Sequence, residues 1–168
     1  MGAAGELGHQ TILPDGPLCG CGNRGCLETL SSGPAIAAQG VWLLHAGRAP
    51  KLHDIVGGDV SRVTPKEMAD AAEAGDSDVR AALARAAEYL GIGIANIVTA
   101  LHPDLVVLGG GVAQIGSLLF DTVRETVRQR VRMFPADGVR IEPSLLGNKA
   151  GTLGGIALAM QHINGFDG

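Results

Sequence analysis

The residue types best suited to chemistry gather in the first thirty positions of this 168-residue chain. Its three cysteines, Cys19, Cys21 and Cys26, all lie there, and His9 precedes them. Thiolate and imidazole are the ligands that a tetrahedral zinc ion prefers, and a closed structural site needs four of them. The set therefore predicts a zinc knuckle with no coordination position left for water.

The segment that joins the cysteines is rich in glycine, with Gly20, Gly22 and Gly25 between the first and the last thiol. Glycine lets a short loop turn back sharply, so three sulfur atoms can converge on one ion. The alternative is a set of buried or redox-active thiols. A disulfide framework is disfavoured, because three cysteines cannot all pair and no secretory signal indicates an oxidising compartment.

Two carboxylates, Glu6 and Glu28, flank the expected metal ligands but are not needed by the metal. Closing the knuckle should bring both of them near the imidazole of His9. Adjacent hydroxyl groups donate well to carboxylates, so two acids beside an oriented imidazole suit a polyhydroxyl ligand. The pattern favours a sugar.

These residues form two signatures, Gly5-Glu-Leu-Gly-His9 and Cys19-x-Cys-Gly-x-x-Gly-Cys-x-Glu28. Together they resemble the ROK family of sugar kinases and sugar-responsive repressors. The similarity continues through His102-Pro-Asp104 and Val107-Leu-Gly-Gly-Gly-Val112 to Leu146-Gly-Asn-Lys-Ala-Gly-Thr-Leu-Gly154. The resemblance implies that sugar hydroxyls bind Glu6, His9 and Glu28, and that zinc is held by His9, Cys19, Cys21 and Cys26.

The resemblance also implies an α/β fold, namely the C-terminal part of an actin-like, ribonuclease-H-like ATPase domain with an inserted zinc knuckle. Kinases of this family carry an Asp-x-Gly-Gly-Thr phosphate loop and an Asn-Asp pair that supplies the catalytic base, and neither pattern occurs in these 168 residues. We therefore expect one incomplete domain over 1–168 whose N-terminal domain is absent. Its sugar and zinc motifs lie in 1–30 and its nucleotide side in 105–168.

The expected function is that of an ATP-dependent hexose kinase of the glucokinase type, with ATP and magnesium in the complete enzyme. Glucose or a related hexose would be the substrate, and the complete protein would be a homo-oligomer. This chain would supply no catalytic residue and would be inactive by itself. The alternative is the sugar-sensing domain of a transcriptional repressor, the one case in which nucleic acid is a partner.

Composition sets outer limits on these functions. A net charge of -4 argues against nucleic acid as a general partner. We expect no membrane partner, because no apolar run reaches the ~18 residues that span a bilayer and no signal segment is recognisable. The expected location is the cytoplasm.

Helix signals place these motifs on regular elements. Ser32 with Pro34, Thr64-Pro-Lys-Glu67 and Ser77 predict helix starts, and glycine or proline marks the corresponding ends. We expect helices over 35–45, 64–74, 77–101, 118–133 and 151–162, and a surface loop over 47–62. The arginines of 124–132 should form a solvated helix face.

Two strands are indicated, a buried parallel strand over 105–108 and another over 139–143, with a weaker candidate over 10–13. Glycines follow the first of them, and ligands in open α/β sheets bind at the carboxyl ends of strands. In the kinases that this chain resembles, the residues matching Gly109 and Gly110 lie against the adenosine of ATP. A sheet this small should leave an edge and an apolar face exposed, and such surfaces promote self-association.

Overall fold

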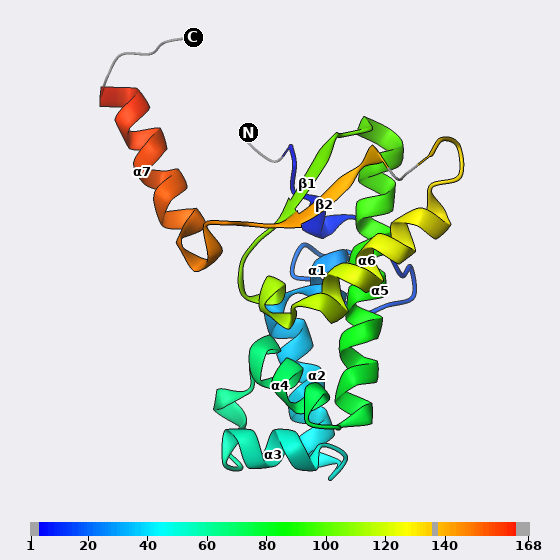
Figure 1. The fold of residues 1–168 in the computed structure, drawn as a ribbon, viewed down its shortest axis with the longest axis vertical. Coiled ribbons are helices and arrows are strands. Elements are labelled where there is room, and N and C mark those ends of the chain that lie inside the picture. The colour runs from blue at the N-terminus through cyan, green and yellow to red at the C-terminus, as the bar shows by residue number, and fades with distance from the viewer. Residues whose placement is uncertain (1–3, 136–137, 164–168) are drawn as a thin grey trace.

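The structure is a computed structural model that describes residues 4–135 and 138–163, without the side chains of 148 and 161–163. Helices form the body of the molecule, a two-stranded parallel sheet lies at one end, and the last helix projects away (Figure 1). The α/β class is therefore confirmed. The helices are α1 Leu27–Ser31, α2 Gly33–His45, α3 Pro50–Val56, α4 Pro65–Glu73, α5 Ser77–Leu101, α6 Ser117–Arg130 and α7 Ala150–Ile163. The strands are β1 Leu105–Leu108 and β2 Arg140–Pro143, and short 3-10 turns are η1 Leu7–His9, η2 Val60–Arg62, η3 Gly111–Ile115 and η5 Gly147–Lys149.

Two helices begin at the expected caps. The Ser32 hydroxyl accepts a hydrogen bond of 3.2 Å from the backbone N–H of Ala35, at the start of α2. At the start of α4, the Thr64 hydroxyl accepts from the backbone N–H of Lys66 at 3.2 Å and donates to the carboxylate of Glu67. Each cap satisfies N–H groups that have no partner within the helix.

The surface loop expected over 47–62 is wrong, because α3 and η2 occupy most of it. Pro50 stands in the first turn of α3, where a missing N–H costs nothing, and Gly57 ends the helix in the left-handed conformation. Leu52 and Val56, four residues apart, are both fully buried. Two apolar residues four positions apart are too short a pattern to predict a helix when glycines stand on both sides of the segment.

Helix α5 is the centre of the helical body and contacts α1, α2, α4 and α6. Its two internal glycines, Gly91 and Gly93, permit close packing. A β-carbon at Gly91 would lie 2.5 Å from Cβ of Thr126 on α6, and one at Gly93 would lie 2.8 Å from Leu27 on α1. Because no side chain fits at these positions, the glycines set how closely the helices approach.

The length and composition of α5 also suffice to cross a membrane, unlike any other helix in the described part of the chain. This differs from the expectation that no such run exists. In the structure, 44% of the most apolar window is buried inside the molecule, and several helices pack around it. A core helix meets the same test of length and hydropathy.

The sheet pairs Leu105 with Arg140 through Leu108 with Pro143 in parallel register. The expectation that β1 is buried is wrong for one of its faces, because Leu105 and Val107 are 40% and 54% exposed. Val106 and Leu108 pack against the core from the other face. The weak strand expected over 10–13 is reduced to a single bridge between Thr11 and Cys26.

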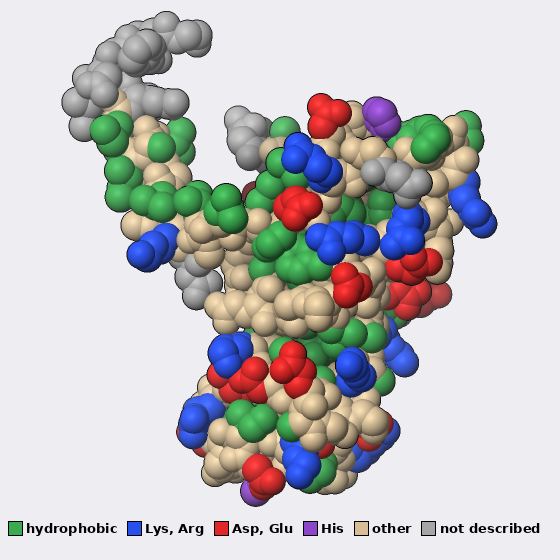
Figure 2. Space-filling view, viewed as in Figure 1, with side chains coloured by type: hydrophobic (Ala, Val, Ile, Leu, Met, Phe, Trp, Pro, Cys, Tyr) green, Lys and Arg blue, Asp and Glu red, His purple; other side chains and the backbone are tan. Residues whose placement is uncertain are grey.

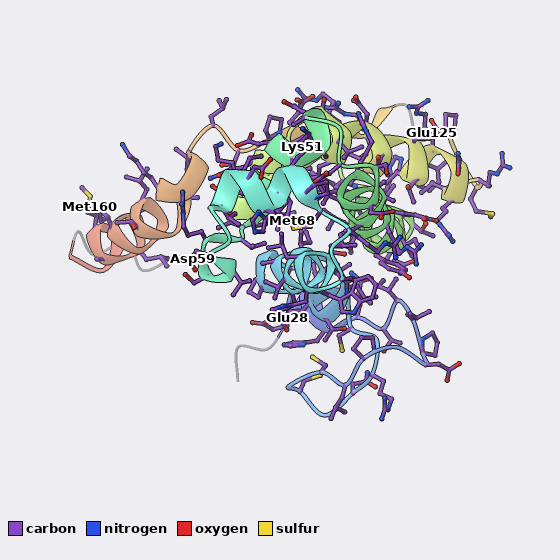
Figure 3. All side chains as sticks on the ribbon, turned by 90° about the horizontal axis from the view of Figure 1, so that it is seen from below. Glu28, Lys51, Asp59, Met68, Glu125 and Met160 are labelled. Atoms are coloured by element: carbon purple, nitrogen blue, oxygen red, sulfur yellow. The ribbon has the colours of Figure 1, made fainter. Side chains whose placement is uncertain are left out.

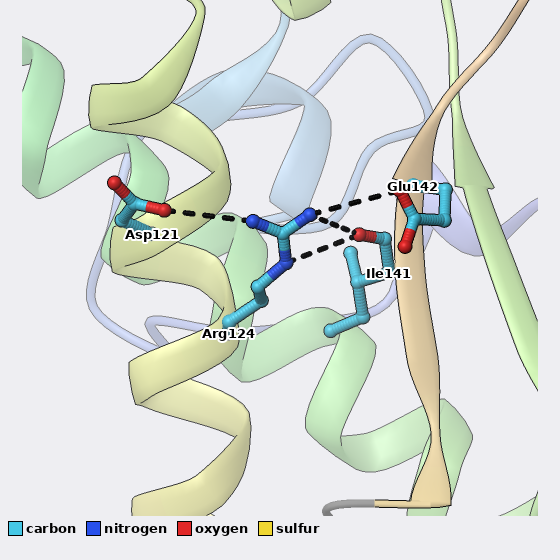
Figure 4. Close-up of polar contacts among 4 residues, drawn as sticks. All are labelled: Asp121, Arg124, Ile141 and Glu142. Atoms are coloured by element: carbon cyan, nitrogen blue, oxygen red, sulfur yellow. Dashed lines mark hydrogen bonds and ion pairs between the residues drawn. The ribbon is translucent and has the colours of Figure 1, made fainter.

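Arg124 contradicts the expected solvated arginine face. Its Nε and Nη2 atoms donate to the backbone carbonyl of Ile141 at 3.2 and 2.7 Å (Figure 4). The guanidinium also pairs with Asp121 at 3.5 Å and with Glu142 at 3.8 Å. Arg124 thereby joins α6 to β2. Arg128 behaves as expected and pairs with Glu125 on the exposed side of the helix.

The last two helices differ in how well they fit the expectation. Helix α6 ends at Arg130, earlier than expected, because Val131 turns to an extended conformation. Helix α7 confirms the expected 151–162 span to within one residue and projects from the body, with Met160 far from the helical bundle (Figures 1 and 3). In the space-filling view, apolar side chains, drawn in green, cover much of this projecting helix (Figure 2). The exposed ones are Leu153, Ile156, Leu158 and Met160.

The glycine packing gives a first prediction. Gly91→Ala should lower the free energy of unfolding by about 1–2 kcal/mol, because overpacking against Thr126 outweighs the better helix propensity of alanine. Gly154→Ala in α7 is the matched control, because open space surrounds that glycine, and it should be neutral or slightly stabilising. Urea unfolding followed by circular dichroism measures both. A Gly91→Ala protein as stable as the wild type would contradict the packing argument.

Candidate metal and ligand site

The knuckle is a tight turn in which the chain reverses direction between Cys19 and Asn23. The backbone N–H of Cys19 donates to the carbonyl of Asn23 at 2.7 Å, and the N–H of Gly22 donates to the carbonyl of Cys19 at 2.9 Å. Gly22 and Gly25 have φ values of 90° and 61°, which favour glycine. This turn brings three thiols, which are far apart along an extended chain, to one side of the loop.

The four expected metal ligands meet at one point. The ligand atoms of His9, Cys19, Cys21 and Cys26 all lie within 4.8 Å of one another. Nδ1 of His9 is 3.5 Å from Sγ of Cys19, and the Sγ atoms of Cys21 and Cys26 are 3.7 Å apart. A tetrahedral zinc ion with ordinary bond lengths separates a nitrogen from a sulfur by about 3.6 Å and two sulfurs by about 3.8 Å. The spacing therefore fits such an ion.

The thiols differ in their readiness to lose a proton. Burial, together with the neighbouring thiols, raises the pKa of Cys26 to about 12 in the metal-free protein. Hydrogen bonding, first from the backbone of Asn23, lowers the pKa of Cys21. Metal ligands must be thiolates, so an entering ion has to displace the proton of Cys26. Metal affinity should consequently fall as the pH falls.

The carboxylates expected beside His9 are placed differently from each other. Oε2 of Glu28, on α1, lies 3.5 Å from Nδ1 of His9, and both side chains are open to solvent. Glu28 lies beside the knuckle loop (Figure 3). Glu6 precedes η1 and is exposed, and within the described residues its carboxylate makes no hydrogen bond or ion pair. The site is an open, acidic surface around one imidazole.

Helix α5 anchors the knuckle through residues that the sequence analysis did not single out. The Asn96 side chain donates to Oε1 of Gln10 at 3.2 Å, and Gly93 receives the side chain of Leu27. The N–H of Leu27 donates to the carbonyl of Gln10 at 2.9 Å. Gly93, a glycine inside an apolar helix, was the one sequence signal of this contact.

The glycines expected to face a nucleotide lie in another part of the chain. Gly109 and Gly110 follow β1, and Gly110 has a φ of 78°. The helix that follows, α6, begins at Ser117, within one residue of the expected start, and a 3-10 turn, η3, occupies the residues between the glycines and that helix. Next to η3, a cavity of about 250 Å³ opens between α4 and α6, with Ile115, Arg80 and Asp121 in its wall.

Comparison with known proteins identifies relatives. A family model described as the ROK family matches residues 1–162. The chain is 35% identical to a glucokinase of Halalkalibacterium halodurans, over 99% of this chain and 50% of that protein. It is 34% identical to a xylose repressor of Caldicellulosiruptor bescii, over 98% of this chain and 41% of the repressor. The chain thus spans about half the length, or less, of these curated relatives.

Solved structures give the same two kinds of relative. A ROK family glucokinase from Streptomyces griseus, in complex with glucose and AMPPNP, superposes with a TM-score of 0.80 at 32% identity. The similarity covers 94% of this chain and 52% of that one. A ROK family transcriptional regulator, a homologue of the E. coli MLC protein, superposes with a TM-score of 0.71 at 28% identity, over 83% of this chain and 34% of the regulator.

The knuckle gives a second prediction. A β-carbon at Gly25 would overlap the backbone carbonyl of Leu13, whereas one at Gly22 would meet open space. Both glycines have positive φ, so an alanine is strained at either position, but the steric clash occurs only at Gly25. Gly25→Ala should abolish tetrahedral thiolate binding of cobalt(II), read from its absorption bands, and Gly22→Ala should retain it. Equal binding by the two variants would show that the turn does not set the ligand geometry.

Proposed function

Because the chain belongs to the ROK family, we propose that it carries the sugar-binding and zinc-binding region of an ATP-dependent hexose kinase of the glucokinase type. The observation that carries this proposal is the pairing of His9 with Glu28 at the edge of a four-ligand Cys/His cluster. The likeness to a glucokinase in complex with glucose and AMPPNP supports it. The proposed fold is the C-terminal part of an actin-like ATPase domain, and the proposed location is the cytoplasm.

Zinc has a structural role in this proposal. His9, Cys19, Cys21 and Cys26 would hold it and fill all four positions, so the ion would not take part in bond making. What it supplies is orientation, because metal on one ring nitrogen of His9 fixes the tautomer and directs the other nitrogen outward. In the structure, Nδ1 lies 3.5 Å from Sγ of Cys19 and also 3.5 Å from Oε2 of Glu28, so metal on Nδ1 would replace the direct contact with Glu28 and leave Nε2 for a ligand.

Sugar would bind to the open side of the cluster. Glu6, His9 and Glu28 together present two carboxylates and one ring nitrogen, which can accept from and donate to hydroxyl groups. Glu28 lies in the first turn of α1, and Gly8 lies next to its Cβ. The helix and the backbone of Gly8 together restrict the position of Glu28. Glucose or a related hexose is the proposed substrate.

Nucleotide would bind on the side of Gly109 and Gly110. The backbone there lies at the carboxyl end of a parallel strand, the usual ligand edge of such sheets. The cavity beside η3 contains charged groups of both signs, but Gly109 and Gly110 do not line it. ATP with magnesium is the proposed phosphoryl donor of the whole protein.

The chemical step itself needs groups that are not in this chain. Phosphoryl transfer to an alcohol requires a base for the hydroxyl proton and donors around the transferred phosphate. Neither an Asp-x-Gly-Gly-Thr loop nor an Asn-Asp pair occurs in the 168 residues. The proposal therefore gives this chain binding residues but no catalytic residue.

A sugar-sensing domain of a transcriptional repressor is the second candidate. The similarity to a xylose repressor, nearly as great as that to a glucokinase, favours it specifically. The two candidates differ on the nucleotide side, because a sensor needs sugar alone. Binding of a nucleotide analogue by Gly109 and Gly110 would favour the kinase, and xylose binding without nucleotide binding would favour the repressor.

The sugar site gives a third prediction. Glu28→Gln should leave the metal content at one zinc per chain but weaken glucose binding about tenfold or more, because an amide accepts less strongly than a carboxylate. A titration of the His9 ring resonances by glucose measures the affinity. Glu88→Gln is the control, because Glu88 is an exposed carboxylate on α5 that is not part of the proposed sugar site. Unchanged affinity in Glu28→Gln would remove this residue from the site.

The missing chemical groups give a fourth prediction. With ATP, magnesium and glucose, the 168-residue chain should form no sugar phosphate above the uncatalysed background, although a fluorescent ATP analogue should still bind. Coupled detection of ADP measures the first property, and fluorescence anisotropy measures the second. Glucose-dependent ADP formation that disappears in Glu28→Gln would contradict the assignment of catalysis to groups outside this chain.

A further inference from the structure

A cavity of about 490 Å³ opens between α2 and α5, and the loop that precedes Cys19 and helix α1 also contribute to its wall. Its size lies within the range of about 300–1,000 Å³ that is usual for small-molecule sites. None of the residues proposed above to bind sugar or nucleotide lines it. The cavity is therefore a separate place on the molecule.

The floor of this cavity is apolar and reaches the hydrophobic core. Ile36 and Leu43 of α2 and Met68 of α4 line it, and each is at most 4% exposed. These side chains offer no hydrogen-bond partner to hydroxyl groups, but they can pack against the hydrocarbon part of a ligand. The floor thus favours an apolar ligand body over a sugar.

Two aromatic side chains add flat surfaces to the wall. Trp42 is 56% exposed, and Tyr89 is half-buried. The guanidinium of Arg48 lies 5.9 Å from the centre of the Trp42 ring, and its Nε donates to Oδ2 of Asp78 at 2.8 Å. The Trp42 ring is thus held by a cation that is itself paired. Flat aromatic walls favour a planar ligand, because rings pack well in offset or edge-to-face contact.

The charges around the cavity do not cancel. Arg48, Asp78 and Arg85 all line it, and Arg48 is paired with Asp78. Arg85 is exposed, and among the described residues its guanidinium has no hydrogen bond or ion pair. The planar fork of a guanidinium matches a carboxylate, which it can bind through two parallel hydrogen bonds. One cation beside an apolar cavity therefore favours a ligand with a single carboxylate.

The wall of the cavity is hydrogen-bonded to the knuckle. The carbonyl of Pro17 accepts from the N–H of Gly25 at 2.8 Å, and the N–H of Leu13 donates to the carbonyl of Gly25 at 3.2 Å. From the other side, the Thr29 hydroxyl donates to the carbonyl of Cys26 at 2.8 Å. All three partners line the cavity. A ligand that moves this wall must therefore also move the backbone of Gly25 and Cys26.

We propose that this cavity is an effector site for a small carboxylate with a planar apolar body. The apolar body packs on the floor beside Trp42, the carboxylate binds Arg85, and the wall transmits occupancy to the backbone of Cys26. The proposal does not depend on the sugar, the nucleotide or a bound metal, and it holds for a kinase and for a repressor alike.

Fluorescence tests the site directly, because Trp42 is the single tryptophan of the 168 residues. The planar carboxylate para-nitrocinnamate should quench this fluorescence with saturation, unlike a collisional quencher. Its neutral analogue para-nitrocinnamyl alcohol should bind about tenfold more weakly, because it lacks the charged partner of Arg85. Arg85→Gln should weaken binding of the carboxylate about tenfold and leave that of the alcohol unchanged. Arg80→Gln is the matched control, because Arg80 is exposed on the same helix but does not line this cavity.

Amide NMR spectra of the full chain test the link to the knuckle. Saturating para-nitrocinnamate should shift the amide resonances of Gly25 and Cys26 but not that of Gly154 in α7. Ala82→Phe fills the cavity and should abolish both the quenching and the shifts. Arg85→Gln breaks no contact within the described residues, so it remains informative even if Ala82→Phe folds poorly. Quenching without saturation, equal affinity for acid and alcohol, full affinity in Arg85→Gln, or unshifted Gly25 and Cys26 amides would each overturn the proposal.

Discussion

The close approach of α5 to its neighbours is the constraint on which the rest of the structure depends. Helix α5 packs closely against the side chain of Thr126 on α6 at Gly91. At Gly93 it packs against the side chain of Leu27, at the start of α1. The first contact fixes α6, which in turn holds β2 through the two hydrogen bonds of Arg124. The second fixes α1, which carries Glu28 toward His9. One helix therefore positions both the sheet and the ligand surface.

The knuckle turn and α5 determine different aspects of the site. The turn itself, through Gly22 and Gly25, brings the cysteines together within residues 19–26. The direction in which the cluster faces is a different matter, because it depends on Gln10 and Asn96 and on the packing of Leu27. A bound metal would stabilise the convergence of the cysteines but would not replace the contacts that orient the cluster. Local geometry and global placement thus have separate causes.

What could be predicted from the sequence follows the same division. The Cys/His cluster joins residues that lie close together along the chain, so residue types and spacing were enough to predict that its four side chains meet. The caps at Ser32 and Thr64 are local as well, and they were found. Helix α3, the exposed face of β1 and the role of Arg124 could not be predicted, because each depends on what lies across the fold. An arginine at helical spacing looks the same whether its partner is water or the carbonyl of Ile141.

The anchoring of the knuckle at Gly93 has a mechanical consequence. Helix α5 has 25 residues, so the part between Gly93 and Ser77 acts as a rigid lever of about 24 Å. If ligand binding rotated the knuckle end of this helix by about 5°, its far end would move by about 2 Å, a displacement of the size that repacks subunit interfaces. A small rearrangement around the His9 imidazole would in this way displace the far end of α5. The same lever would serve an enzyme that closes on its substrate and a sensor that releases its target.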